Sequence, residues 1–104
     1  MKKRSRVKID VPEAQLEAFC QQNHIRWLAF FGSVLRNDFG SHSDIDVLVQ
    51  FEPGYRIGLI RLAGMEIELS NLLGRKVDLR TPADLSRYFR QEVMDKAEVA
   101  YVQG

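Results

Sequence analysis

The pattern that most constrains the fold is a pair of apolar segments joined by a glycine-serine turn and a polar loop. The first segment, residues 25–31, is short and rich in aromatic residues, which is typical of a mostly buried strand. Gly32 and Ser33 follow it directly. The second segment, residues 44–51, opens with two aspartates separated by one residue and continues as an apolar run. We expect two strands whose connection begins with a phosphate-binding turn and ends with a pair of carboxylates.

The two aspartates of the second segment, Asp44 and Asp46, fall on one face of the expected strand, because successive side chains alternate between faces. Their Cα atoms would lie about 6.6 Å apart at roughly 3.3 Å per residue. Carboxylates at this spacing can converge on one Mg²⁺ or bracket two ions. Mg²⁺ takes oxygen ligands and is commonly completed by substrate phosphates. The pair therefore predicts a site for one or two magnesium ions.

The glycine-serine turn supplies the features that a phosphate needs. Gly32 lets a phosphate approach the backbone closely, and Ser33, at the start of a short helix over residues 33–36, offers a hydroxyl and N–H groups. A third carboxylate, Asp78, lies in a predicted strand over residues 76–80. If that strand lies beside the strand that carries Asp44 and Asp46, the three carboxylates can meet, and Asp78 can bind a second metal or accept a proton. These residues together favour metal-dependent phosphate chemistry.

The rest of the chain predicts three longer helical segments around these strands. The first covers residues 10–22, with Asp10 as its cap and Pro12 in its first turn. The second covers residues 57–73, with Gly64 expected at a close packing contact and Gly74 at its end. Its apolar positions form a broad stripe of Ile57, Ile60 and Ile67, flanked by Leu59, Ala63, Leu69, Leu72 and Leu73. A third helix begins at Thr81 and Pro82, and residues 100–102 form a terminal apolar stretch. The order of elements predicts an α/β (α+β) fold with a small mixed sheet flanked by helices.

The composition bounds the domain organisation and the cell compartment. We expect a basic N-terminal tail over residues 1–9 and one domain over residues 10–104 of the 104-residue chain. The net charge of +1 combines +5 in the first eight residues with about −4 in the remainder, which argues against direct nucleic-acid binding by the body. No apolar run is long enough for a membrane span, no apolar signal segment follows Met1, and the single cysteine, Cys20, predicts a packed hydrophobic residue. A cytoplasmic protein without membrane contact is expected.

Three stretches of the sequence resemble a known family of enzymes. Gly32-Ser33 followed after ten residues by Asp44-Ile45-Asp46 is similar to the signature of the DNA-polymerase-β-like nucleotidyltransferase superfamily. Residues 32–36, 43–49 and 74–79 resemble the minimal nucleotidyltransferase (MNT) family within it. The similarity runs from about residue 25 to residue 101, and the combined motif is specific.

The resemblance implies a nucleotidyltransferase core that transfers AMP from ATP with Mg²⁺ and releases pyrophosphate. Gly32 and Ser33 match the triphosphate-binding pair, and Arg36 and Ser43 match further nucleotide-binding positions. The family's catalytic and metal-binding carboxylates correspond to Asp44, Asp46 and Asp78. Members of the family commonly pair with HEPN-domain toxins. The resemblance thus implies an antitoxin of a type VII toxin–antitoxin pair that modifies a toxin hydroxyl, expected to be a tyrosine.

Two other functions stay open at the level of sequence. A non-catalytic antitoxin would neutralise the toxin by binding alone; the three aspartates argue against it, because neighbouring carboxylates without a metal repel one another. A small-molecule nucleotidyltransferase of the antibiotic-modifying kind would need a separate acceptor-binding subunit, since the chain has no residues left for a further domain. The short chain favours an acceptor carried by a protein partner.

Overall fold

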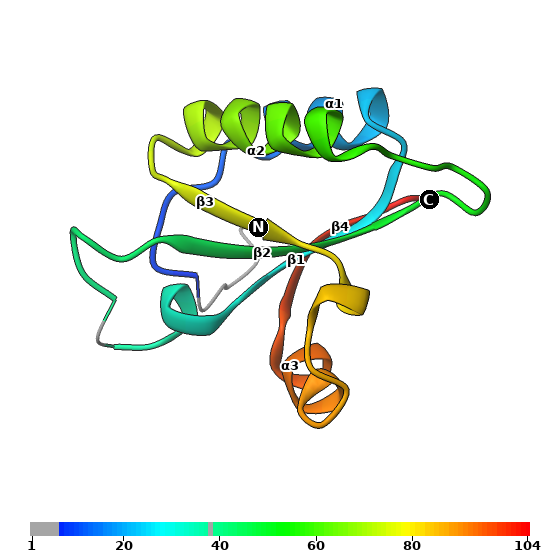
Figure 1. Cartoon of the computed structure of the whole chain (residues 1–104). Helices are drawn as coiled ribbons and strands as arrows, with labels where there is room; N and C mark the ends of the chain where they lie inside the picture. Colours follow the sequence, from blue (N-terminus) through cyan, green and yellow to red (C-terminus); the bar gives the residue numbers. More distant parts are fainter. Residues whose placement is uncertain (1–6, 38) are drawn as a thin grey trace.

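The computed structural model describes residues 7–37 and 39–104 and contains a four-stranded mixed sheet in the order β3-β2-β1-β4 (Figure 1). The strands are β1 (Ile25–Phe31), β2 (Ile45–Phe51), β3 (Val77–Arg80) and β4 (Glu98–Val102). β1 pairs antiparallel with both β2 and β4, whereas β2 and β3 run parallel. The predicted mixed sheet with flanking helices is confirmed.

Two helices cover one face of this sheet and enclose the core. Figure 1 shows α1 (Glu13–Gln22) and α2 (Leu59–Leu73) side by side above the strands. The short helices η1 (Gly32–Leu35) and η2 (Pro82–Asp84), both 3-10, and α3 (Arg90–Lys96) lie on the other side. Within the described ranges, no helix is long and apolar enough to cross a membrane. The second face of the sheet is thus lined by η1, which contains the glycine-serine turn, and by η2 and α3, which follow β3.

Strand alternation places the apolar side chains of β2 toward the helices. Ile45, Val47 and Val49 are fully buried in the core cluster, as predicted. Asp46 therefore points to the opposite face and is half-buried there, while Leu48 on that same face is also fully buried. Cys20 is buried in the core, as expected, and burial, with a smaller contribution from Glu17, raises the pKa of its thiol to about 12.

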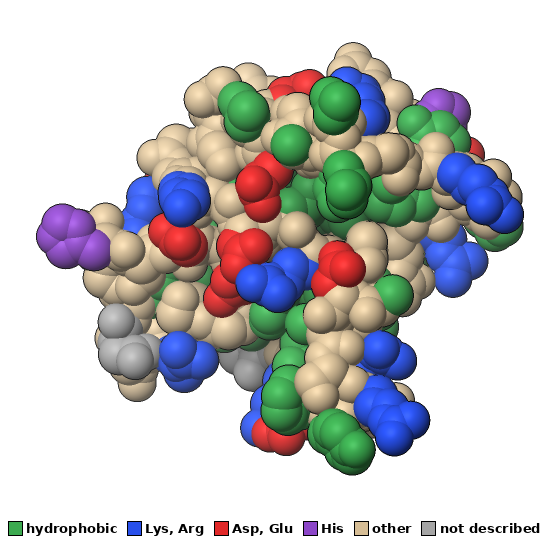
Figure 2. Space-filling model, viewed as in Figure 1, with side chains coloured by type: hydrophobic (Ala, Val, Ile, Leu, Met, Phe, Trp, Pro, Cys, Tyr) green, Lys and Arg blue, Asp and Glu red, His purple; other side chains and the backbone are tan. Residues whose placement is uncertain are grey.

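The predicted buried stripe of α2 is wrong in part. Ile60 and Ile67 are 91% and 64% exposed. The buried face runs through Leu69 and Leu73, which are predicted at the flank of the stripe, and through Met65, which is not part of it. Apolar residues of this helix occur on its exposed faces as well as on its buried face, so their spacing does not identify the buried one. Figure 2 shows hydrophobic side chains on the outer surface over α2. The close packing predicted at Gly64 is also wrong: apart from its chain neighbours and the nearby backbone of α2, no atom of the described residues would lie within 4 Å of a Cβ at this position.

The ends of α1 and α2 differ in how well the sequence predicted them. α1 begins at Glu13 with Pro12 before it, and no side chain of the described region caps it, so the predicted cap at Asp10 is wrong. Gly74 ends α2 in the left-handed conformation at φ 71°, as predicted. The predicted basic tail falls mostly on residues 1–6, outside the described residues. Lys8 N–H donates to Val34 O at 3.0 Å, so the chain joins the fold within the segment predicted as tail.

The region after β3 contains an additional strand. A capping box forms between Thr81 and Asp84, but the helix there is only the short η2, and α3 follows as a second helix. The terminal apolar stretch belongs to β4, which pairs with β1 through Leu28 and Tyr101 and extends the sheet from three predicted strands to four. β4 is an edge strand with mostly exposed side chains, so its position depends on long-range pairing rather than on a local pattern.

Candidate active site

The glycine-serine turn and the first carboxylates are in direct contact at the end of β1. Gly32 has φ 75°, a conformation that favours glycine, and a Cβ at this position would overlap Asp46 Oδ2. The Ser33 hydroxyl donates to the backbone oxygen of Asp44 at 3.4 Å. The turn is therefore packed directly against the start of β2.

A row of side chains crosses three adjacent strands next to this turn. In the antiparallel β1–β2 pair, Phe31 is opposite Asp46, and in the parallel β2–β3 pair, Asp46 is opposite Asp78. Asp78 alternates with Val77 and Leu79, which belong to the core, so its side chain shares the second face of the sheet with Asp46. The prediction that the third aspartate lies beside the strand of the first two is confirmed.

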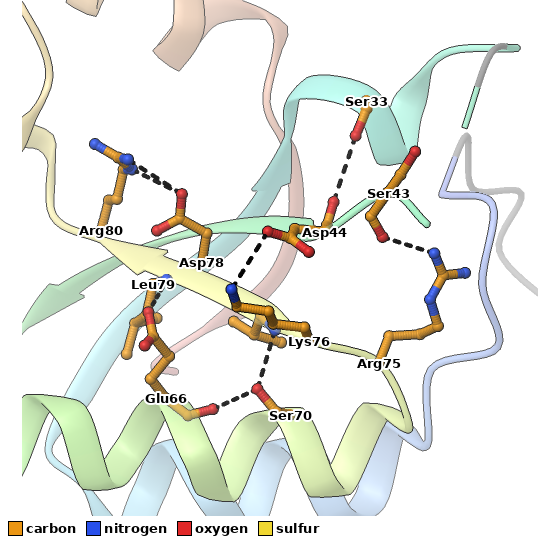
Figure 3. Close-up of polar contacts among 11 residues, drawn as sticks. Ser33, Ser43, Asp44, Glu66, Ser70, Arg75, Lys76, Asp78, Leu79 and Arg80 are labelled. Carbon is orange, nitrogen blue, oxygen red and sulfur yellow. Dashed lines mark hydrogen bonds and ion pairs between the residues drawn. The ribbon is translucent and has the colours of Figure 1, made fainter. Parts of the chain in front are cut away.

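The carboxylates at the ends of the site each face a cation (Figure 3). Arg80 Nη2 lies 3.1 Å from Asp78 Oδ2, and Lys76 Nζ lies 3.9 Å from Asp44 Oδ2. Figure 2 shows acidic and basic side chains interspersed over this face of the molecule. Asp46, between the two, has no cation within ion-pair distance in the part of the chain that the structure describes.

The surroundings of Asp46 make its ionised form costly. Burial raises the pKa of the Asp46 carboxyl above its ordinary value, and repulsion from Asp78 and then Asp44 raises it further. The charge of Arg80 and a backbone hydrogen bond from Ser33 lower this pKa without reversing the shift. An additional positive charge nearby, such as a bound metal ion, would stabilise the ionised Asp46 carboxylate.

The carboxylate oxygens of this site suit Mg²⁺ chemically, although they do not form a closed cage. Across residues 7–37 and 39–104, no three His, Cys, Asp or Glu side chains are gathered closely enough to hold a metal on their own. Mg²⁺ sites that serve phosphate transfer take one or two protein carboxylates and complete the shell with water and substrate phosphates. Asp46 and its two acidic neighbours, Asp44 and Asp78, fit this kind of open site. Their roles as metal ligands remain predictions.

The two remaining predicted nucleotide-binding residues lie on either side of the polar loop. Arg36 follows η1, and its N–H donates to Ser33 O at 2.9 Å. The Ser43 hydroxyl accepts from the Gly40 N–H at 3.1 Å and is therefore engaged within the loop. Arg36 directly follows the helix that contains the turn, whereas Ser43 directly precedes Asp44, and the contacts of both with a nucleotide remain predictions.

Arg75 is a residue of this region that the sequence did not single out. Its guanidinium donates to the backbone oxygens of Gly40 and Ser43, each at 2.6 Å, and lies 4.6 Å from the centre of the Phe39 ring. It thereby ties the link between α2 and β3 to the loop that leads into Asp44 (Figure 3). A lone arginine after a helix-ending glycine carries no local signal for such a contact.

Two side chains of α2 hold β3 in place from its outer edge. Glu66 Oε2 accepts from the Leu79 N–H at 2.8 Å, and Ser70 Oγ accepts from the Val77 N–H at 3.0 Å (Figure 3). These bonds satisfy backbone donors that an edge strand would otherwise present to solvent or to another strand. They fix the strand that carries Asp78 beside β2.

A mixed sheet with a glycine-serine turn against strand-borne carboxylates is the architecture of enzymes that transfer nucleotides. A family model described as "Nucleotidyltransferase domain" matches residues 13–100, which is most of the chain. The chain therefore belongs to the nucleotidyltransferase domain family, and within it to the minimal nucleotidyltransferases. One relative, named protein adenylyltransferase MntA in Thermococcus cleftensis, is 35% identical over 78 residues, covering 75% of each chain.

Solved structures give the same fold. One described as a proposed minimal nucleotidyltransferase aligns with TM-score 0.65 at 35% identity, over 82% of this chain and 84% of that one. A toxin–antitoxin structure with AMP-PNP aligns with TM-score 0.71 at 20% identity, over 89% and 75%. A complex of the tri-AMPylated Shewanella oneidensis HEPN toxin with its MNT antitoxin aligns with TM-score 0.62 at 20% identity, over 88% and 70%. The last two, at this identity, establish likeness of fold alone.

Proposed function

We propose that this chain is a Mg²⁺-dependent protein adenylyltransferase that transfers AMP from ATP to a hydroxyl, expected to be a tyrosine, of a HEPN-domain toxin. In this role it would act as the antitoxin of the pair. The observation that carries the proposal is the register of β2 and β3, which sets Asp46 opposite Asp78 beside the Gly32 turn. The name of the Thermococcus cleftensis relative and the toxin complexes among the structural neighbours support the donor and the partner.

The proposed reaction forms one bond to the α-phosphorus of ATP and breaks another. The acceptor hydroxyl oxygen bonds to the α-phosphorus, and the bond from that phosphorus to the bridging oxygen breaks, so that pyrophosphate leaves with the electron pair. The hydroxyl proton passes to a nearby carboxylate, for which Asp78 at the end of the row is the candidate. Mg²⁺, when bound, would neutralise phosphate charge and stabilise the leaving pyrophosphate.

In this proposal, the glycine-serine turn binds the triphosphate and the three carboxylates bind the cation. The Gly32 turn, where a side chain would overlap the Asp46 carboxylate, would bind the triphosphate through its backbone, and Ser33 and Arg36 border it. Burial and two like charges raise the pKa of Asp46, so a bound cation would stabilise this carboxylate. Asp44 and Asp78 would exchange their ion pairs with Lys76 and Arg80 for the metal.

The direct test is co-expression with the candidate toxin followed by intact-mass spectrometry of that toxin. We expect a mass increase of one or more AMP groups with the wild type and none with Asp46→Asn. Tandem mass spectrometry then locates the modified hydroxyl. Wild-type protein that binds the toxin and MgATP but adds no AMP would contradict the proposal.

The ion pairs at Asp44 and Asp78 give a specific reason to test neutralisation by binding alone. Each of these carboxylates has a cationic partner without any metal, so the fold does not need a cation at these two positions. If Asp46→Asn protects cells from the toxin at the same dose as the wild type, occlusion rather than transfer accounts for neutralisation. We expect loss of protection.

A further inference from the structure

A cavity of about 300 Å³ lies between η1 and α3, next to the candidate active site. Its apolar walls come from Phe31 and Leu35 on one side and from Phe89 and Val93 on the other. Figure 1 shows that η1 and α3 both lie on the face of the sheet opposite α1 and α2. The cavity therefore lies on the side of the sheet away from the core helices, and the exposed side chains of Phe89, Glu92 and Lys96 in its lining leave it accessible to solvent. Its volume is at the lower end of the range for small-molecule sites.

The cavity is continuous with the row of residues that forms the site. Phe31, in its wall, is the cross-strand partner of Asp46, and side chains at such positions have Cβ atoms about 5 Å apart. Gly32 lines the cavity as well as facing Asp46. A molecule that fills the cavity would thus end where the phosphate turn and the carboxylates begin.

The walls of the cavity suit a flat aromatic ligand with a polar edge. Phe89 is 56% exposed and lies outside the core cluster, so packing within the fold does not account for an aromatic ring at this position. At the rim, Lys96 and Glu92 form an ion pair of 2.9 Å, which offers both a donor and an acceptor. Aromatic walls with a polar rim bind a ring through stacking and orient it through its edge.

We propose that this cavity binds the base and ribose of the nucleotide donor, with the base against Phe89 and the triphosphate extending across Gly32 toward Asp46. This inference rests on the proposed function, since it assigns a position to that reaction's donor. The arrangement makes α3, which follows the carboxylate strands in the chain, the specificity element for the base. The competing occupant is an aromatic side chain of the acceptor protein.

The test compares ligands with and without a base by titration calorimetry. Wild type, Phe89→Ala and the matched control Tyr88→Ala are titrated with a non-hydrolysable ATP analogue plus Mg²⁺ and, separately, with inorganic triphosphate plus Mg²⁺. Tyr88 is the adjacent aromatic residue, is 83% exposed and does not line the cavity. We expect Phe89→Ala to weaken the ATP analogue on the order of ten-fold and triphosphate by less than two-fold. Tyr88→Ala should change neither.

Two further variants make the result specific to the cavity. Phe89→Trp retains a stacking surface and should restore affinity for the analogue to within about three-fold of the wild type. Val93→Phe fills the cavity and should weaken the analogue at least as much as Phe89→Ala. Thermal denaturation of each variant verifies that it is folded, which we expect because Phe89 lies outside the core cluster.

Several outcomes would overturn the assignment. Unchanged affinity of Phe89→Ala for the analogue removes the base from the cavity, and so does an equal loss for the analogue and triphosphate. Unchanged nucleotide binding combined with reduced modification of the toxin assigns the cavity to the acceptor instead. If the wild type transfers AMP while any of these results is obtained, the proposed function stands without this inference; if the wild type binds no ATP, both fail.

Discussion

Gly32 and Asp46 are interlocked at the start of the candidate site. Gly32, at φ 75°, presents a bare Cα to the Asp46 carboxylate, and a Cβ there would overlap Oδ2. The residue proposed to lie against the triphosphate and the residue proposed to hold a cation therefore share one contact. A change at the turn is expected to displace the carboxylate, so the two halves of the site cannot vary independently.

This contact predicts that Gly32→Ala is far more damaging to transfer than to folding. Both Gly32→Ala and the control Gly54→Ala place a side chain at positive φ, which costs about 1 kcal/mol each. No atom of the described residues lies within 4 Å of a Cβ at Gly54, whereas one at Gly32 displaces Asp46. We expect a loss of AMP transfer on the order of 100-fold for Gly32→Ala and little change for Gly54→Ala, measured with labelled ATP. Equal activities would show that the contact has no role in positioning.

The raised pKa of Asp46 predicts that removing its charge stabilises the metal-free protein while abolishing activity. A carboxyl whose folded-state pKa is raised favours folding fully below its unfolded value near 3.8, and this stability is lost as the pH rises through the folded-state pKa. At pH 7, Asp46→Asn should therefore unfold at a higher urea concentration than the wild type, by a small margin because the group is partly screened by solvent. The difference should disappear near pH 3.5.

Urea unfolding without divalent cations, followed from pH 3.5 to pH 8, measures this difference. Asp84→Asn is a suitable control for the loss of one carboxylate outside the site, although Asp84 accepts a hydrogen bond from the Thr81 N–H at 3.0 Å. Because Asp84→Asn perturbs this hydrogen bond, we expect it to lower the free energy of unfolding. Adding Mg²⁺ should then stabilise the wild type more than Asp46→Asn. A variant that is less stable than the wild type at pH 7 would contradict the account of Asp46 as a strained charge.

Local patterns predicted those parts of the fold that depend on neighbours in sequence. β1 and β2 are short alternating or continuous apolar runs, and the alternation of Val77, Asp78 and Leu79 was enough to place Asp78 opposite the core. Its position across from Asp46 required only that the two strands be adjacent. The turn at Gly32 was likewise predictable, because its residue types are dictated by local conformation.

The features that sequence reasoning missed depend on contacts between distant segments. β4 is held by pairing with β1, and its own residues are mostly exposed, so the strand lacks the alternation that would reveal it. The buried face of α2 could not be chosen because Ile60 and Ile67 are as apolar as Met65 and Leu69. Cavities between short helices, such as the one beside η1, arise from tertiary arrangement alone.

The hydrogen bond from Leu79 N–H to Glu66 predicts a stability role for an acidic residue on α2. Glu66→Ala leaves this mostly buried backbone donor without its acceptor, which should cost about 1–3 kcal/mol. Glu66→Gln keeps a carbonyl oxygen in place and should cost less than half as much. Glu68→Ala, an exposed position on the same helix, serves as the control. Thermal unfolding measures all three; equal melting temperatures for Glu66→Ala and Glu68→Ala would show that Glu66 does not support β3.

The contacts of Arg75 predict a positioning role for the loop that leads into Asp44. Arg75→Lys loses the planar guanidinium that covers the Phe39 ring while Nη2 donates to two carbonyl oxygens, so the loop should loosen while the core stays intact. We expect faster proteolysis within residues 37–43 and a several-fold higher KM for ATP, with kcat lowered less. Arg87→Lys, which alters another arginine–aromatic contact of 5.3 Å far from this loop, is the matched control. Because a purely structural residue would shift the melting temperature without changing the KM-to-kcat balance, unchanged KM and proteolysis would assign Arg75 to stability alone.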